Sequence, residues 1–277
     1  MVLSGEAIGS GTVLFELRDG VGTVTLNRPE RRNAISWSLV EDLLAAFARA
    51  RAERGLRVLV VTGAGRDFCV GADLAKVGSD DARDQETRTL RGRSVADDLE
   101  RLTRASAVVE TLVAFPMPTI AAVNGACAGA GLSLALAADF RIAARDAAFN
   151  TAFVSAGVSG DLGSAWLLTR AVGDARARAL LLDPGKITAE RAAEWGLVTE
   201  TTSDLRARVR ELAAKLAAQA PKAMLYAKRN LAEAALATLP DYLQGEMPRM
   251  VDCARSGDAR RAAQAFLEKR RPVFTGE

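Results

Sequence analysis

The N-terminal part of the chain combines two strand patterns, one helical pattern and a fully apolar run. Apolar and polar residues alternate along 12–18 and 21–27 around Asp19-Gly20, which predicts a β-hairpin. Apolar residues then recur at helical spacing over residues 34–54. The run VLVVT at 58–62 is typical of a strand that a sheet buries on both faces.

The same two kinds of pattern alternate through the middle of the chain. Buried strands are predicted at 120–123 and 140–143, and irregular chain at the Ser- and Gly-rich residues 149–163. The predicted helices cover 91–115, which Pro116 and Pro118 end, then 164–172, 175–182 and 188–195. Because strands alternate with helices, the pattern indicates an α/β core with crossover connections over residues 1–200.

Residues 201–277 have a different character. From Asp204 to Arg270 the chain is alanine-rich and almost continuously helical, with breaks near Pro221, Pro240 and Gly257. One side of these helices is too apolar to stay in water. We therefore expect this helical region to pack on the core or on another subunit.

Two loops of small residues follow two of the predicted strands. One is 63–73, in GAGRDFCVGADL, and the other is 125–131, in MPTIAAVNGACAGAGLSLALAAD. Small residues let a ligand approach the backbone, and the start of a helix offers unpaired N–H groups. Such a loop suits a negative charge or a polarised carbonyl oxygen. Neither loop has the GxGxxG or GxxxxGK[ST] pattern, which excludes dinucleotide and NTPase sites of those kinds.

Composition removes several classes of function. The 277 residues include no histidine, which excludes Ser-His-Asp and Cys-His nucleophile systems and histidine-based metal sites. The formal charge is +3 and the arginines are scattered, so nucleic-acid binding is not indicated. Three distant cysteines predict a reduced protein without disulfides or a metal site. No signal peptide or membrane-spanning run is recognised, so we expect a cytoplasmic protein.

Six motifs follow one another along the chain: LNRPERRNAIS (26–36), VLVVTGAGRDFCVGADL (58–74), PTIAAVNGACAGAGLSLALAADFRIA (118–143), GVSGDLGSAWLLTRAVG (157–173), ITAERAAEWGLV (187–198) and AAQAFLEKRRPVF (262–274). Together they resemble the crotonase superfamily, the enoyl-CoA hydratases and isomerases, over about residues 12–274. The resemblance implies a crotonase (ClpP-like) α/β fold of repeated ββα units. It also implies an acyl-CoA thioester substrate, with coenzyme A as part of the substrate and no tightly bound cofactor. A homotrimer or a dimer of trimers is implied too, with residues 201–277 as the trimerisation region.

The resemblance also assigns roles to residues of the two loops. It implies an oxyanion hole made by the backbone N–H groups of Ala72 and Ala130, where each such donor typically lowers the barrier by about 3 kcal/mol. The resemblance implies that a hydratase of this family uses two glutamates as its acid and base. The two corresponding positions here hold Ser133 and Phe153. Ordinary two-glutamate hydration is therefore disfavoured.

Asp161 matches an aspartate used by dienoyl-CoA isomerases, by ring-opening isomerases of phenylacetate breakdown and by aryl-CoA dehalogenases. The run AGVSGDLGSAWLLTRAVG resembles the phenylacetate-pathway isomerases most closely. Asp161 could instead cap the next helix, which would hold its pKa down. Neighbours in an apolar pocket would raise that pKa; the candidates are Phe153, Val158, Leu162 and Trp166. With the resemblance, we favour catalysis over capping.

The remaining candidates are contacts to substrate or to CoA. Ser133, Phe153, Val158 and Trp166 are predicted to line the substrate pocket. Arg28, Arg32 and Lys76 correspond to contacts with CoA phosphates and adenine, although surface arginines are usually only solvated. Asp73 is also interpreted as structural, holding the first loop. The loops contribute Ala72, Asp73, Leu74 and Gly129 to the CoA-binding set, and a neighbouring subunit would contribute Phe266 and Lys269.

The favoured function is an enoyl-CoA isomerase in which Asp161 both removes and returns the proton, since one base suffices for such a shift. An enoyl-CoA hydratase that uses Asp161 and an ordered water is the first alternative. Displacement on an aryl-CoA with Asp161 as nucleophile is disfavoured, because that branch resembles a system with an activating histidine and a tryptophan at the Phe153 position, and both are absent here. A non-catalytic CoA-binding subunit is the fourth possibility. The acyl group stays open, because it depends on residues 77–95 and on the surroundings of Phe153 and Trp166.

Overall fold

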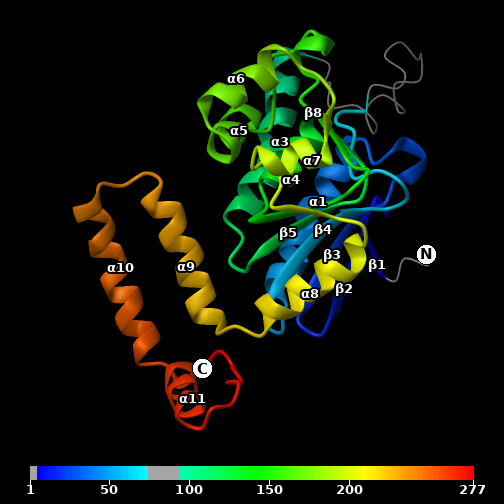
Figure 1. The fold of residues 1–277 in the computed structure, drawn as a ribbon. Helices are drawn as coiled ribbons and strands as arrows, with labels where there is room; N and C mark the ends of the chain where they lie inside the picture. Colours follow the sequence, from blue (N-terminus) through cyan, green and yellow to red (C-terminus); the bar gives the residue numbers. More distant parts are fainter. Residues whose placement is uncertain (1–4, 74–93) are drawn as a thin grey trace.

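The computed structural model describes residues 5–73 and 94–277 of the chain (Figure 1). Its centre is a seven-stranded sheet in the order β1-β2-β3-β4-β5-β7-β10. The predicted hairpin is confirmed as β2 (Val13–Arg18) and β3 (Val21–Leu26), with β1 (Glu6–Ile8) at its edge. From β3 onward the strands run parallel, through β4 (Val58–Gly63), β5 (Thr119–Val123), β7 (Phe140–Ala144) and β10 (Glu200–Thr202).

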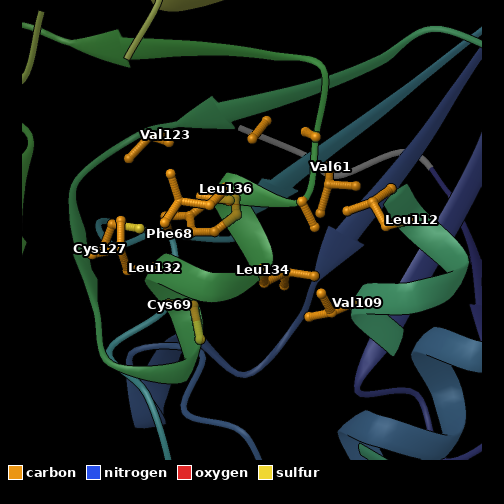
Figure 2. Close-up of a cluster of buried hydrophobic side chains, with 14 of the residues drawn as sticks. Val61, Phe68, Cys69, Val109, Leu112, Val123, Cys127, Leu132, Leu134 and Leu136 are labelled. Atoms are coloured by element: carbon orange, nitrogen blue, oxygen red, sulfur yellow. The ribbon is translucent and has the colours of Figure 1, made fainter. Parts of the chain in front are cut away.

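Helices cover both faces of this sheet, which explains why its central strands are apolar throughout. On one face lie α1 (Trp37–Ala52), α3 (Val95–Val113) and α4 (Ala130–Leu136). Figure 2 shows Leu132, Leu134 and Leu136 of α4 among buried side chains from β4, β5 and α3. On the other face, α8 (Leu205–Ala217) packs against Val58, Ile120 and Ile142.

The structure contains a second, three-stranded sheet, much of it in segments that were predicted as loop or irregular chain. Its strands are β6 (Ala126–Ala128), β8 (Ala148–Asn150) and β9 (Ile187–Thr188). Each strand has only two or three residues and pairs with a strand distant in sequence, so no local alternation announces it. Residues 126–128 were predicted as loop and 149–150 as irregular chain, and both predictions were wrong.

The second sheet completes the repeating unit that the resemblance implies. β5, β6 and α4 follow one another as a strand of the large sheet, a strand of the small sheet and a helix. β7, β8 and α5 (Ser164–Val172) repeat that order. The ββα expectation is therefore confirmed, and each of the two repeats ends in a helix.

The helices beyond the second sheet agree closely with the predicted ones. They are α5, α6 (Asp174–Leu182) and α7 (Ala189–Glu194). The later breaks also fall as expected: Pro221 begins α9 (Pro221–Ala234), Pro240 lies in the first turn of α10 (Leu239–Ala254), and Gly257 begins α11 (Gly257–Leu267). In Figure 1, α9 and α10 project from the core and α11 lies at their far end. α8 belongs to the same helical region but packs on the sheet.

Candidate active site

The two loops of small residues lie against each other at the carboxyl ends of the neighbouring strands β4 and β5. We call residues 63–73 the first loop and residues 124–131 the second loop. Phe68 N and Cys69 N both donate to Ala126 O at 3.1 Å, and Ala128 N donates to Cys69 O at 2.9 Å. These bonds form a short parallel bridge between Cys69 and Cys127. Ligands of parallel sheets bind at this end of the strands.

Two glycines of the second loop are needed for this close approach. A methyl group on Gly131 would stand 2.3 Å from Cys69 O, so no other residue fits without moving the first loop. Gly129 has φ 53° and ψ −128°, a backbone conformation that is strained for residues with a side chain. A methyl group there would stand 3.7 Å from Gly71 Cα. The small residues therefore serve the contact between the loops as well as the approach of a ligand.

The paired loops carry two backbone amides, Ala72 N and Ala130 N, that have no acceptor in the described part of the chain. Ile35 N donates to Gly71 O at 2.8 Å and Ile35 O accepts from Asp73 N at 2.9 Å. Because successive amides of an extended chain point opposite ways, the N–H of Ala72 points away from Ile35. Ala130 is the first residue of α4, where backbone N–H groups have no partner within the helix. Within residues 5–73 and 94–277, neither N–H has a hydrogen-bond acceptor.

The residues expected to contact CoA divide into buried and exposed ones. Asp73 is 4% exposed and forms ion pairs with Arg28 at 2.8 Å and Arg31 at 2.5 Å, as a structural role for Asp73 requires. Arg28 is 8% exposed and also donates to Ala34 O, so its guanidinium is part of the loop scaffold. Arg32 pairs with Asp67 at 2.7 Å but leaves its side chain 58% exposed.

The other predicted CoA contacts lie elsewhere. Leu74 and Lys76, with most of the segment 77–95, lie outside the described residues. Phe266 belongs to α11 and Lys269 follows it, and in Figure 1 this helix is far from the two loops of its own chain.

Asp161 does not cap the helix that follows it. The N-cap of α5 is Gly163, and no side chain makes a capping hydrogen bond there, so that interpretation was wrong. One carboxylate oxygen of Asp161, Oδ1, is buried and has no hydrogen-bond partner among the described residues. Burial raises the pKa of this carboxyl above its ordinary value of 3.8. Of the two directions that the sequence left open for this pKa, the structure favours the upward one, with burial as its cause.

The surroundings of Asp161 tie it to the second loop. Phe153 is 6% exposed, and its ring lies against both Gly129 and Gly160, within 4 Å of where a methyl group on either would stand. Ser133 is fully buried on α4, and its hydroxyl donates to Asp161 O at 3.3 Å. Val158 and Trp166 are about half exposed, and Arg170 covers the Trp166 ring at 3.5 Å.

The cysteines beside the loops are not activated. Burial raises the pKa of the Cys69 thiol to about 12, and the nearby carboxylate of Asp161 adds to the rise. Burial also raises the pKa of Cys127 well above the ordinary range. A thiol that stays protonated is a poor nucleophile, so both side chains act as small apolar packing residues.

Sequence reasoning missed several residues that hold the loops together. Asn33 donates to Ala64 O and Asp67 O, Asp67 accepts from Ala126 N, and Asn124 bonds with Gly63 and Gly65. Arg31 was also missed, although it pairs with Asp73. Asn and Asp between small residues favour local side-chain to backbone bonds, which was the available signal.

Among the described residues, no group of three or more His, Cys, Asp or Glu side chains is arranged to hold a metal ion. None of the helices described here is long and apolar enough to cross a membrane.

Comparisons with known proteins agree with this architecture. The sequence profile of the enoyl-CoA hydratase/isomerase family matches residues 16–277. A probable enoyl-CoA hydratase of Rhodobacter capsulatus is 41% identical over 272 aligned residues, and the alignment covers 96% of this chain and 98% of the relative. The 1,2-epoxyphenylacetyl-CoA isomerase of Escherichia coli K12 is 37% identical over 269 residues, with the same coverage of 96% and 98%.

A crystal structure of an enoyl-CoA hydratase from Bacillus anthracis is similar in fold, with a TM-score of 0.87, 30% identity and coverage of 96% and 100%. The fold and these likenesses define an enzyme of the crotonase type. The chain belongs to the enoyl-CoA hydratase/isomerase family. Names of both hydratases and isomerases occur among its relatives.

The raised pKa of Asp161 predicts that Asp161→Asn stabilises the protein. A folded-state pKa above the unfolded value of 3.8 means that the charged form is less stable in the folded protein. This carboxyl contributes stability only at low pH, and the contribution is lost as the pH rises through the folded pKa. The neutral variant should therefore unfold at a higher temperature at pH 7, and its advantage should shrink as the pH falls towards 3.8.

Thermal unfolding of both proteins between pH 4 and pH 8 measures this difference. Asp174→Asn is the matched control, because the side chain of Asp174 is 68% exposed in a surface pair with Arg178. Exposed pairs contribute little, so this control should leave the midpoint nearly unchanged. An Asp161→Asn variant that is less stable than the wild type at pH 7 would contradict the assignment of a desolvated carboxylate.

Proposed function

We propose that this protein is an enoyl-CoA isomerase that moves a carbon–carbon double bond along the acyl chain of a CoA thioester, with Asp161 as its single base. The observation that carries the proposal is one carboxylate oxygen of Asp161, which is buried, has no hydrogen-bond partner among the described residues and belongs to a carboxyl of raised pKa. Such a group is unstable unless a ligand or a proton satisfies it. Coenzyme A enters as part of the substrate.

The two free amides supply the stabilisation that this chemistry needs. In the proposed complex, Ala72 N and Ala130 N donate to the thioester oxygen. Negative charge develops on that oxygen when a proton leaves the neighbouring carbon. Donors fixed about 2.7–3.1 Å from the oxyanion typically lower the barrier by about 3 kcal/mol each. The contact between the loops supports this role, because it fixes the two donors before substrate arrives.

The proton balance needs one carboxylate only. Asp161 takes the proton from Cα of a 3-enoyl thioester, and the electron pair of that C–H bond passes into a dienolate on the thioester oxygen. The resulting carboxylic acid then gives the same proton to Cγ, and the electrons return to form the C2=C3 double bond. Ser133 and Phe153 stand at the two positions where the resemblance to hydratases would place glutamates. Neither side chain is able to act as a second carboxylate.

Asp161→Asn should abolish double-bond migration while leaving the fold intact. The expected loss of kcat is about 10²–10⁴-fold, the usual contribution of a general base, with little change in the dissociation constant for CoA. Conversion of 3-hexenoyl-CoA to 2-hexenoyl-CoA and hydration of crotonyl-CoA are measured in parallel, with Asp174→Asn as control.

The two assays also separate the alternatives. Migration that survives in Asp161→Asn would remove Asp161 from the mechanism. Faster hydration of crotonyl-CoA than migration in the wild type would make the protein a hydratase. CoA binding without either reaction would make it a non-catalytic homologue.

The helical region supports an assembly of several copies, which we propose to be a homotrimer or a dimer of trimers in the cytoplasm. No residue of α9 or α10 is fully buried within the described parts of the chain. Several of their large apolar residues are well exposed instead, a feature typical of surfaces that bind another protein; they are Leu231, Leu239, Met247 and Met250, and Leu236 in the connection between the two helices is exposed too. Such an assembly would let Phe266 and Lys269 of α11 reach CoA in a neighbouring subunit, beside Arg32 of the receiving one.

Light scattering during size-exclusion chromatography tests this assembly. The wild type should have three or six times the chain mass of 29.3 kDa. The double variant Leu231→Glu, Met250→Glu should dissociate, because it places charge on the exposed apolar face of both helices. Leu182→Glu on α6, 72% exposed outside this region, is the control and should keep the wild-type mass. A monomeric wild type would contradict the proposal.

A further inference from the structure

We infer that Asp67 and Asn124 are positioning residues that fix the distance between the two amide donors; the inference rests on the proposed function. Each side chain reaches from one loop to the backbone of the other. Asp67 Oδ1 of the first loop accepts from Ala126 N of the second at 3.1 Å. In return, Asn124 Oδ1 accepts from Gly63 N at 3.2 Å and Asn124 Nδ2 donates to Gly65 O at 3.1 Å. We call this reciprocal pair the clasp.

The clasp completes a connection that the backbone makes only in part. Backbone bonds join residues 68–69 to residues 126 and 128, next to the donors. The clasp joins the loops on the other side of that bridge, where they leave β4 and β5. With both sides fixed, the loops have little freedom to pivot about the bridge. Ala72 N and Ala130 N then keep one spacing.

Asp67 is held firmly enough for this task. It is 5% exposed, its Oδ2 accepts from Arg32 Nε at 2.7 Å, and its backbone oxygen accepts from Asn33 Nδ2 at 2.8 Å. Arg32 lowers the pKa of Asp67, so the carboxyl stays charged and both oxygens remain acceptors at neutral pH. The Ala126 peptide is thereby bound at both ends, since its oxygen also accepts from Phe68 N and Cys69 N.

Loss of the clasp should weaken the polarisation of the thioester and leave CoA binding unchanged. A displacement of about 1 Å in a catalytic group can cost on the order of 100-fold in rate, and a loosened loop should cost about tenfold. Asp67→Ala and Asn124→Ala should each lower kcat for double-bond migration by about tenfold, with KM changed by less than about twofold.

A spectroscopic signature separates this role from a loss of stability. Hydrogen bonds to the carbonyl oxygen of cinnamoyl-CoA, a conjugated thioester, withdraw electrons and shift its absorption to longer wavelength. The wild type should shift the spectrum of bound cinnamoyl-CoA, and Asp67→Ala and Asn124→Ala should lose most of the shift. Asp67→Asn keeps an acceptor oxygen for Ala126 N and should retain the shift.

Asp42→Ala is the matched control. Asp42 is 4% exposed and accepts hydrogen bonds from Ser10 and Thr12, so its loss destabilises the fold without touching either loop. This variant should unfold at a lower temperature and keep the full spectral shift. If Asp67→Ala does not fold, Asn124→Ala carries the test, since Asn124 is only partly buried.

Two outcomes overturn the inference in different ways. Wild-type shift and rate in both Asp67→Ala and Asn124→Ala, or an equal loss in Asp42→Ala, would remove the clasp and leave the proposed function standing. Binding of cinnamoyl-CoA to the wild type without any shift would overturn the proposed oxyanion hole itself.

Discussion

The contact between the first and second loops is the constraint on which the rest of this site depends. Hydrogen bonds between residues 68–69 and residues 126 and 128 join chain segments that leave two neighbouring parallel strands. The contact demands small residues, because a methyl group on Gly131 would meet Cys69 O. It also leaves the N–H groups of Ala72 and Ala130 without acceptors in the described structure. Donors fixed in this way need no reorganisation when charge develops on a bound carbonyl oxygen.

Asp161 is a further polar group that the fold leaves unsatisfied among the described residues, here a buried acceptor instead of a donor. The fold places a carboxylate where burial raises its pKa and leaves one oxygen without a partner in the described chain, at a cost in stability that a surface position would avoid. Ser133 joins the backbone of Asp161 to α4, and Ala130 begins that same helix. The proposed base and one proposed donor are thus joined by a single side-chain hydrogen bond.

Much of this fold could be predicted from the sequence where the signal is local. The hairpin at residues 13–26, the apolar strand β4 and the helices α5 and α6 follow from alternation, apolar runs and helical spacing. β6 and β8 could not be predicted, because three-residue strands gain their stability from partners far along the chain. The capping role considered for Asp161 failed because Gly163 adopts the N-cap position instead.

The residues of the candidate site divide in the same way, into those that a local pattern or a motif identifies and those that depend on contacts between distant segments. The two loops and Asp161 were identified from the sequence through small residues and through resemblance to a family. Arg28 was expected at the surface, but its pairing with Asp73 depends on how residues 26–36 wrap around the first loop. The bonds of Asp67 and Asn124 depend on the crossing of two loops, which no local pattern contains. Side-chain contacts between loops that are distant in sequence are therefore known only from the structure.

The most direct measurement of the central claim is a crystal structure of the protein with a non-reactive 3-enoyl-CoA analogue bound. The account predicts the thioester oxygen about 2.7–3.1 Å from both Ala72 N and Ala130 N. It also predicts the Asp161 carboxylate about 3–3.5 Å from Cα or Cγ of the acyl chain. A thioester oxygen bound away from these two amides, or an acyl chain out of reach of Asp161, would contradict it.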